Sequence, residues 1–200
     1  MFIVLATEDE LSEAVSLRLI AHAFGNDVEV QALGRKGNGY LRSKLGNFIE
    51  IAQRYPVLLL TDLDALPCAG ELVTDWINGR VLPDNLLLRV AVRETESWLL
   101  ADRDNFAQFL GVGFNKIPQD PEALPDPKAH LYTIARRAQK SVRAELIIQR
   151  GANASRGIGY NRLLSDYVRT AWDFESAAER SQSLRRTVNR LAELAERIRY

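Results

Sequence analysis

An apolar run that ends in two aspartates is the feature that most limits what this chain can fold into. Residues 57–61 read Val-Leu-Leu-Leu-Thr, with Pro56 before them, and Asp62-Leu63-Asp64 follows. A continuous apolar run of this length is typical of a strand inside a parallel sheet that helices cover on both faces. Ligands of open α/β sheets bind just outside the carboxyl ends of such strands. The run therefore predicts an α/β fold and puts both aspartates where a ligand would bind.

The rest of residues 1–112 alternates between strand and helix patterns. Apolar or alternating runs predict further strands at residues 2–6, 28–33 and 85–92. Helical spacing and stop signals predict helices at residues 10–24, 41–54, 69–78, 96–101 and 103–110. This alternation favours a Rossmann-like α/β domain, with a mainly parallel sheet of about four strands flanked by helices.

A proline-rich stretch separates this domain from the rest of the chain. Residues 113–127 contain Pro118, Pro121, Pro125 and Pro127, so we expect an ordered connector rather than a helix or strand. Residues 128–200 predict a helical extension that packs on the first domain. Its helices are expected at residues 128–140, 160–172 and 175–198.

The net charge is zero, yet the charge is divided between the two parts of the chain. Residues 1–127 hold 11 Lys and Arg against 19 Asp and Glu, a balance of −8, whereas residues 128–200 hold 15 against 7, a balance of +8. A basic segment beside an acidic one favours contact with a polyanion, or docking of one segment on the other. A helix with a solvated basic face explains the charge equally well.

Composition narrows the class of protein further. The single cysteine, Cys68, excludes an intramolecular disulfide and a cysteine-rich zinc site. The apolar start, Met1–Thr7, is too short for a signal peptide, and no apolar run approaches the length of a membrane span. We therefore expect a cytoplasmic protein that does not enter a membrane, while its oligomeric state stays open.

Acidic residues follow several of the predicted strands. Glu8-Asp9-Glu10 follows the first strand, Asp62 and Asp64 the third, and Glu94 and Glu96 the fourth. The carboxyl ends of parallel strands share one edge, and crowded carboxylates need a cation to offset their repulsion. Mg²⁺ prefers such oxygen ligands. A divalent metal site is therefore predicted, although helix capping explains the first group as well.

These residues resemble a known family. A hydrophobic strand ending near a glutamate, followed by a strand ending in Asp-x-Asp, resembles the TOPRIM (topoisomerase–primase) fold. The segment Glu96-Ser-Trp98-Leu-Leu-Ala-Asp102 resembles the narrower "E-A-W-hydrophobic-L-A-D" signature of the TOPRIM-like bacterial family called domain of unknown function 4276. The likeness covers roughly residues 1–140, and the Trp98 segment is its more specific part.

The resemblance implies a chemistry as well as a fold. It implies that Glu8 is a general acid/base and that Asp62 and Asp64 hold Mg²⁺ or Mn²⁺ for phosphodiester cleavage or joining. Glu96 is either a further metal ligand or a helix cap. The Glu-Gly pair usual in TOPRIM domains is replaced here by Glu8-Asp9-Glu10, so Asp9 and Glu10 compete with Glu8 for the acid/base role. Whether the chain is an enzyme therefore stays open.

Two glycine-bearing loops carry the candidate substrate-binding residues. Gly34–Gly39 reads Gly-Arg-Lys-Gly-Asn-Gly, so Arg35 and Lys36 could hold phosphate, although connector flexibility explains the glycines too. The loop matches neither a Walker A motif nor Gly-x-Gly-x-x-Gly. In the later loop, Arg156 precedes Tyr160, a pairing that suits backbone contact and base stacking, but a structural loop that joins two helices is the favoured explanation.

Three functions are compatible with these residues. The first is a Mg²⁺-dependent phosphoryl-transfer enzyme that acts on nucleic acid, with a nuclease as the favoured form. The second is an inactive TOPRIM-like module that binds nucleic acid or a partner protein; the resemblance implies that this partner is an ATPase. The third is a protein that binds a small phosphate compound at Gly34–Gly39. DNA or RNA preference, sequence specificity and pathway are not encoded in any motif.

Overall fold

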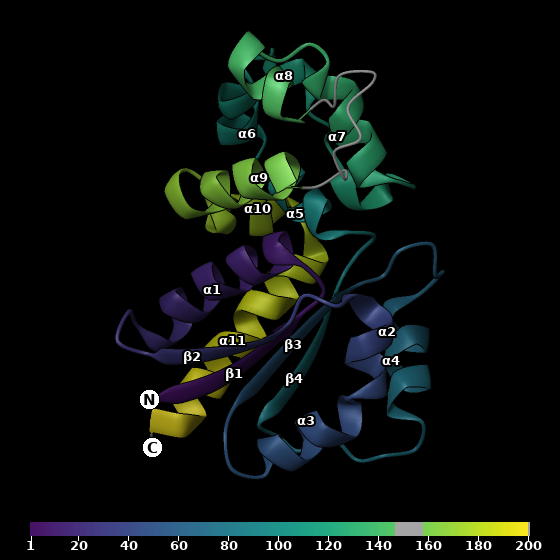
Figure 1. The fold of residues 1–200 in the computed structure, drawn as a ribbon, viewed down its shortest axis with the longest axis vertical. Helices are drawn as coiled ribbons and strands as arrows, with labels where there is room; N and C mark the ends of the chain where they lie inside the picture. Colours follow the sequence, from purple (N-terminus) through teal and green to yellow (C-terminus); the bar gives the residue numbers. More distant parts are fainter. Residues whose placement is uncertain (147–157, 200) are drawn as a thin grey trace.

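The computed structural model describes residues 1–146 and 158–199, and its centre is a four-stranded parallel sheet (Figure 1). The strand order is β2-β1-β3-β4, and every neighbouring pair is parallel. The strands are β1 (Phe2–Thr7), β2 (Glu29–Gly34), β3 (Val57–Asp62) and β4 (Leu86–Ala91). The predicted α/β fold, a mainly parallel sheet flanked by helices with a helical C-terminal part, is confirmed.

Helices connect the strands and continue beyond the sheet. The helices of the first part are α1 (Glu10–Phe24), α2 (Gly37–Ser43), α3 (Leu45–Ala52), α4 (Ala69–Ile77), α5 (Thr95–Ala101) and α6 (Arg103–Leu110). Two short 3-10 turns, η1 (Phe114–Lys116) and η2 (Pro121–Ala123), lie in the proline-rich connector. The later helices are α7 (Pro127–Ala135), α8 (Lys140–Leu146), α9 (Ile158–Thr170), α10 (Phe174–Arg180) and α11 (Gln182–Arg199).

The predicted helix over residues 175–198 is wrong in one respect, because it is two helices. Ser181 has an extended backbone, with φ −120° and ψ 111°, and ends α10. Its Oγ accepts a hydrogen bond of 3.2 Å from the amide of Leu184 and so caps the first turn of α11. The predicted helix over 41–54 is likewise divided, into α2 and α3. A serine that can cap a helix therefore interrupts an otherwise continuous apolar pattern.

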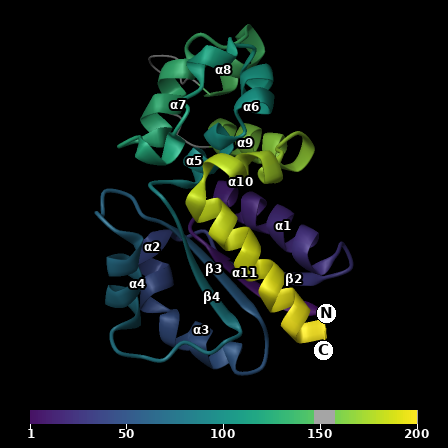
Figure 2. The same cartoon turned by 180° about the vertical axis from the view of Figure 1, so that it is seen from behind.

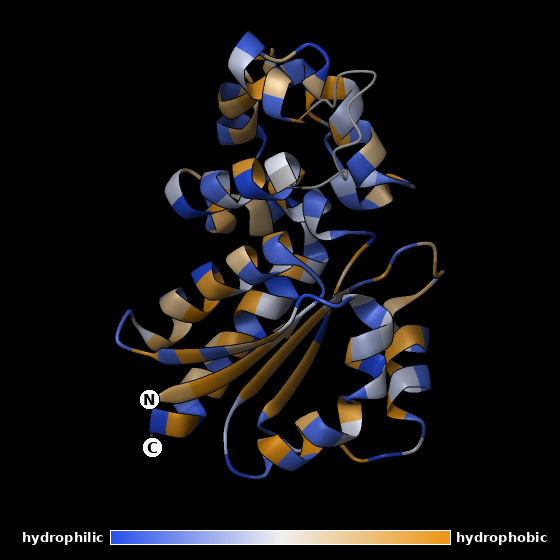
Figure 3. Ribbon diagram, viewed as in Figure 1, coloured by the Kyte–Doolittle hydropathy of each residue, from blue (hydrophilic) through white to orange (hydrophobic). Residues whose placement is uncertain are grey.

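Helices cover both faces of the sheet, as the apolar strands require. Val4 and Ala6 of β1 face a core formed with α2, α3 and α4. Ile3 and Leu5 face a second core that includes side chains of α1, α5, α9 and α11. Figure 3 shows β1, β3 and β4 as largely hydrophobic, whereas β2 is mixed. Alternate residues of one strand therefore contribute to different cores, which is the reason for the unbroken apolar run in β3.

The C-terminal helix returns to the sheet. Helix α11 lies beside α1 and β4, on the face away from α3 (Figure 2). Leu191 and Leu194 of α11 belong to the same buried cluster as Ile3 and Leu5 of β1. Residues from the C-terminal part thus complete one core of the sheet. The predicted limits at residues 112 and 128 stay a prediction, which the truncation experiment in the Discussion tests.

The parallel register brings the strand ends to one side of the sheet, here called the carboxyl edge. Thr7 is in register with Gly34, and Asp62 is in register with Ala91. Helices α5 to α10 lie beyond this edge (Figure 1). Within residues 1–146 and 158–199, no helix is both long and apolar enough to cross a membrane.

Candidate functional site

Four acidic residues lie at or just after strand ends on the carboxyl edge: Glu8, Asp62, Asp64 and Glu96, here called the acidic edge. Asp62 is the last residue of β3. Its Oδ1 accepts hydrogen bonds from the amide of Thr95 (3.0 Å) and from the Thr95 hydroxyl (2.8 Å). Burial raises the pKa of Asp62 well above its usual range, and the charges of Glu96 and Glu8 raise it further.

Glu8 directly follows β1 and points to β3. Its Oε1 accepts hydrogen bonds from the Thr61 hydroxyl and, at 2.9 Å, from the amide of Asp62. Burial raises the pKa of Glu8, and the charges of Asp64 and Asp9 add to this, while the two hydrogen bonds oppose it. Two neighbouring strands therefore hold the Glu8 carboxyl group against the backbone of Asp62.

Asp64 has a different environment from Asp62. Its backbone is left-handed, with φ 52°, and its amide donates a 2.8 Å hydrogen bond to the carbonyl of Arg93. Its side chain is exposed and accepts a 3.2 Å hydrogen bond from the Asn38 side chain. The two aspartates of the Asp-x-Asp motif thus have different partners. Asp62 is hydrogen-bonded to Thr95 of α5, and Asp64 is hydrogen-bonded to Asn38 of α2.

Glu96 is the most buried residue of the acidic edge, with 4% of its surface exposed. Its Oε1 accepts a 2.9 Å hydrogen bond from the Tyr160 hydroxyl and lies 3.5 Å from the Lys128 ammonium. Burial raises the pKa of Glu96, although Lys128 and Tyr160 oppose the shift. Both partners come from the C-terminal part of the chain. Tyr160, which the sequence suggests for base stacking, is instead buried in α9, and separations of 32 and 64 residues carry no local signal for either contact.

The competing acids after β1 have other tasks. Asp9 is the N-cap of α1: its Oδ1 accepts a 2.9 Å hydrogen bond from the amide of Ser12, and Ser12 Oγ accepts one from Asp9 N. Glu10 lies in the first helical turn, where a negative charge is favourable. Among these three acids, Glu8 is the one that contacts β3.

The predicted substrate-binding residues Arg35 and Lys36 lie between β2 and α2, beside the acidic edge, since the next residue, Gly37, donates a 3.1 Å hydrogen bond from its amide to the Glu8 carbonyl. Arg35 forms a fork with Glu13, with distances of 2.8 Å from Nε and 2.6 Å from Nη2. The Lys36 ammonium lies 5.0 Å from the centre of the Tyr40 ring. Helix α2 begins at Gly37, within the predicted loop. Arg156 lies outside the residues that the structure describes.

The acidic edge has the chemistry of a site for a hard cation, but its side chains do not enclose one. Among the described residues, no three Asp, Glu, His or Cys side chains stand where they could hold a metal ion together. In Asp62 and in Glu8, one carboxylate oxygen accepts hydrogen bonds from protein groups. The second oxygen, Oδ2 of Asp62 or Oε2 of Glu8, accepts no hydrogen bond from the described residues. The donor type therefore suits Mg²⁺, and the carboxylates would have to converge to bind it.

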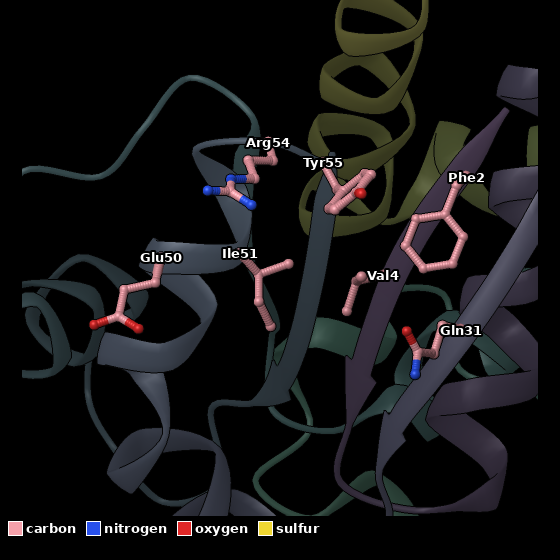
Figure 4. A pocket seen from close by; sticks show the side chains of 7 residues that line it. All are labelled: Phe2, Val4, Gln31, Glu50, Ile51, Arg54 and Tyr55. Atoms are coloured by element: carbon pink, nitrogen blue, oxygen red, sulfur yellow. The ribbon is translucent and has the colours of Figure 1, made fainter.

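A cavity of about 750 Å³ lies away from the acidic edge. Phe2, at the amino end of β1, lines it together with Val4, Ile51 and Tyr55, and Gln31 of β2 lies beside Phe2 (Figure 4). Its lining is mainly apolar and includes no residue of the acidic edge. Glu50 and Arg54 also line the cavity, but a single carboxylate is no cluster of acids like the acidic edge.

No protein-family model, no curated protein and no solved structure matches this chain. The likeness to TOPRIM-like proteins and to domain of unknown function 4276 therefore stays a prediction from the Trp98 and Asp-x-Asp motifs. The function has to be argued from the acidic edge itself.

Proposed function

We propose that this chain is a Mg²⁺- or Mn²⁺-dependent enzyme that cleaves phosphodiester bonds of nucleic acid at the acidic edge. The observation that carries the proposal is the grouping of Glu8, Asp62 and Glu96 at the carboxyl edge, where the charges of Glu96 and Glu8 add to the effect of burial and raise the pKa of Asp62. Charge of one sign, gathered where ligands of parallel sheets bind, suits a site that receives a cation together with a phosphate.

The aspartates are the residues that would hold the metal ion. The charges of Asp62 and Asp64 both interact with that of Glu8, and Glu96 would supply a further oxygen. When bound, a divalent ion would neutralise charge on phosphate oxygens and lower the pKa of a coordinated water. Thr95 would keep the Asp62 carboxylate oriented, because it holds Oδ1 by two hydrogen bonds.

Glu8 is the candidate for proton transfer. Thr61 and the Asp62 amide hold its Oε1, which leaves Oε2 as the oxygen that could accept or donate a proton. Burial raises the pKa of Glu8 towards the pH at which an enzyme works, as general acid/base catalysis requires. Glu8 would then take a proton from the attacking water or return one to the leaving oxygen.

A second candidate function is a module that binds nucleic acid or a partner protein such as an ATPase without cleaving anything. The observation in its favour is that Lys128 and Tyr160 already balance the charge of Glu96. An acidic cluster with an internal counterion has less need of a metal ion.

Cleavage assays distinguish the two functions. Purified protein is incubated with end-labelled DNA and RNA in the presence of Mg²⁺, Mn²⁺ or EDTA. We expect cleavage only with a metal ion, and a loss of roughly 100-fold or more in Asp62→Asn, because the substitution removes a ligand charge. The matched control is Asp75→Asn, an exposed aspartate that pairs with Arg42 on the surface and should cleave like wild type.

The assay can also contradict the proposal. If wild type and Asp62→Asn bind the nucleic acid equally and neither cleaves it, the module is the correct function. Absence of nucleic-acid binding at low salt, where phosphate contacts are strongest, excludes both the nuclease and a nucleic-acid-binding module, and leaves a module that binds a partner protein.

A further inference from the structure

The outer edge of β4 borders a cavity that is separate from the acidic edge. The carbonyl of Ala91 accepts a hydrogen bond from the Leu63 amide, so the peptide groups of Ala91 face β3. Because successive residues of a strand direct their peptide groups to opposite sides, those of Leu88 and Val90 point away from β3, to the outer edge of the sheet. Residues of α4, β4 and α11 line a cavity of about 230 Å³ along this side, and Figure 2 shows β4 between these two helices. Its polar lining comes from Arg89, Gln182, Ser183, Arg186 and Glu122.

Two arginines in this cavity form no ion pair with an acid among the described residues. Arg89 Nε donates a 3.3 Å hydrogen bond to the Thr187 hydroxyl, and no ion pair with the described residues engages its guanidinium. Arg186 is exposed and forms no ion pair within the described part of the chain. Burial lowers the pKa of Arg89, and the charges of Arg190 and Arg186 lower it further. Positive charge is therefore crowded at the middle of β4.

The acids nearby are engaged elsewhere. Glu122 lines the same cavity, but its carboxylate accepts hydrogen bonds from Ser181 Oγ (2.6 Å), Ser183 N (2.9 Å) and Ser183 Oγ (2.6 Å), and from Gln182 N (3.2 Å). Glu193 forms a 2.6 Å ion pair with Arg190. Neither carboxylate forms an ion pair with Arg89 or Arg186 among the described residues. An external anion with several oxygens would match the unpaired guanidinium groups.

The position of Arg89 relates the cavity to the acidic edge. Arg89 lies two residues before Ala91, which is in register with Asp62 on the neighbouring strand. At about 3.3 Å per residue and about 4.8 Å between strands, the two backbone positions are roughly 8 Å apart. One nucleic-acid chain carries a charge about every 3.4 Å along a duplex, so a few nucleotides span this distance.

We propose that Arg89 and Arg186 bind a phosphate group of the nucleic-acid backbone in the cavity between β4 and α11. The inference rests on the proposed function for its ligand, and it adds a contact that supplies binding rather than cleavage. The phosphate would sit beside the free edge of β4 and direct the neighbouring nucleotides to the acidic edge.

Binding without metal tests this site apart from catalysis. The probe is a fluorescein-labelled single-stranded oligodeoxynucleotide, and anisotropy is followed in EDTA over a range of salt concentrations. We expect Arg89→Gln and Arg186→Gln each to weaken binding about fivefold to tenfold at low salt and to reduce the salt slope by about 1. Arg186 is exposed, so its substitution leaves folding intact, and the amide introduced by Arg89→Gln can still donate to Thr187.

Arg185→Gln is the matched control, since it removes the same charge from the next position of α11. Arg185 lines a different surface hollow, together with Asp120 and Glu179. A loss confined to the Arg89 and Arg186 variants supports the site even if the protein never cleaves nucleic acid. Equal losses in all three variants, or none, overturn the site even if cleavage is found. Thermal stabilisation of wild type, but not of Arg89→Gln, by inorganic phosphate without oligonucleotide binding also overturns it, since the ligand is then free phosphate.

Discussion

At the scale of single residues, burial decides the chemistry of the acidic edge more than the identity of its side chains. Asp62 and Asp64 are two positions apart, yet Asp62 accepts hydrogen bonds from Thr95, whereas Asp64 accepts one from Asn38 at the surface. Burial raises the pKa of Asp62, with further contributions from the charges of Glu96 and Glu8. The folded protein therefore keeps a carboxyl group where its ionised form is unfavourable.

This arrangement predicts that Asp62→Asn stabilises the metal-free protein at neutral and alkaline pH. The pKa of Asp62 is raised in the folded state, so the stability of wild type is greatest below the pKa of an unfolded aspartate and falls as the pH rises through the raised value. Asparagine has no such dependence. In EDTA, thermal unfolding at pH 8 should occur about 2–4 °C higher in the variant, for a gain on the order of 1 kcal/mol.

The same measurement near pH 4 supplies the control. Near pH 4 the Asp62 carboxyl group approaches protonation in both the folded and the unfolded state of wild type. The difference in unfolding temperature between wild type and Asp62→Asn should therefore shrink or vanish. A stabilisation that is equal at both pH values would show that the ionisation of Asp62 is not its cause.

At the scale of elements, the close approach of β1 and β2 depends on one glycine. Gly34 ends β2 with a φ of 149°, and a Cβ at this position would lie 2.3 Å from the Thr7 carbonyl oxygen. The Arg35 amide donates a 2.8 Å hydrogen bond to the same oxygen. The glycine that the sequence suggests for a phosphate loop is thus required for the approach of the two strands next to Glu8.

We therefore expect Gly34→Ala to destabilise the protein by about 1–3 kcal/mol or more, since it combines a backbone strain with a clash against backbone atoms. Gly46→Ala is the matched control: Gly46 lies in α3 with nothing within 4 Å of an added Cβ, so alanine should stabilise by about 0.5–1 kcal/mol. Urea unfolding followed by circular dichroism measures both. Equal effects of the two substitutions would contradict the assigned role of Gly34.

At the scale of the whole molecule, the two ends of the chain share one core. Leu191 and Leu194 of α11 pack in the same buried cluster as Ile3, Leu5 and Leu58 of the sheet. Trp98 of α5 donates a 2.7 Å hydrogen bond to Ser183 at the start of α11. The helical part is therefore structurally continuous with the sheet on this face.

From this packing we predict that residues 1–112 do not fold cooperatively when produced alone. Removal of α11 exposes apolar side chains over one face of the sheet, each of which contributes about 1.5–3 kcal/mol when buried. The fragment should bind a hydrophobic dye and lack a sharp thermal transition, whereas a chain shortened only by Tyr200 should melt like wild type. A cooperative transition of the fragment would establish residues 1–112 as an independent domain.

The sequence alone was sufficient for the fold class. An apolar run such as Val57–Leu60 indicates a strand in the middle of a covered parallel sheet, because side chains on both faces of such a strand are buried. The same pattern correctly indicated that acids follow the strand ends, so Glu8, Asp62 and Glu96 could be named in advance. The sequence did not predict the break between α10 and α11. Ser181 makes this break by capping α11, and hydrophobic periodicity carries no signal for a helix cap.

Only the tertiary structure decided how these acids are partnered. The contacts of Glu96 with Lys128 and Tyr160, and of Glu122 with Ser183, join segments far apart in the chain. The Asp-x-Asp spacing does not tell that Asp62 is hydrogen-bonded to Thr95 while Asp64, with its left-handed backbone, is hydrogen-bonded to Asn38. Periodicity and motifs report local preferences, while the burial of a side chain and the resulting shift in its pKa, as at Arg89, arise from packing between distant elements.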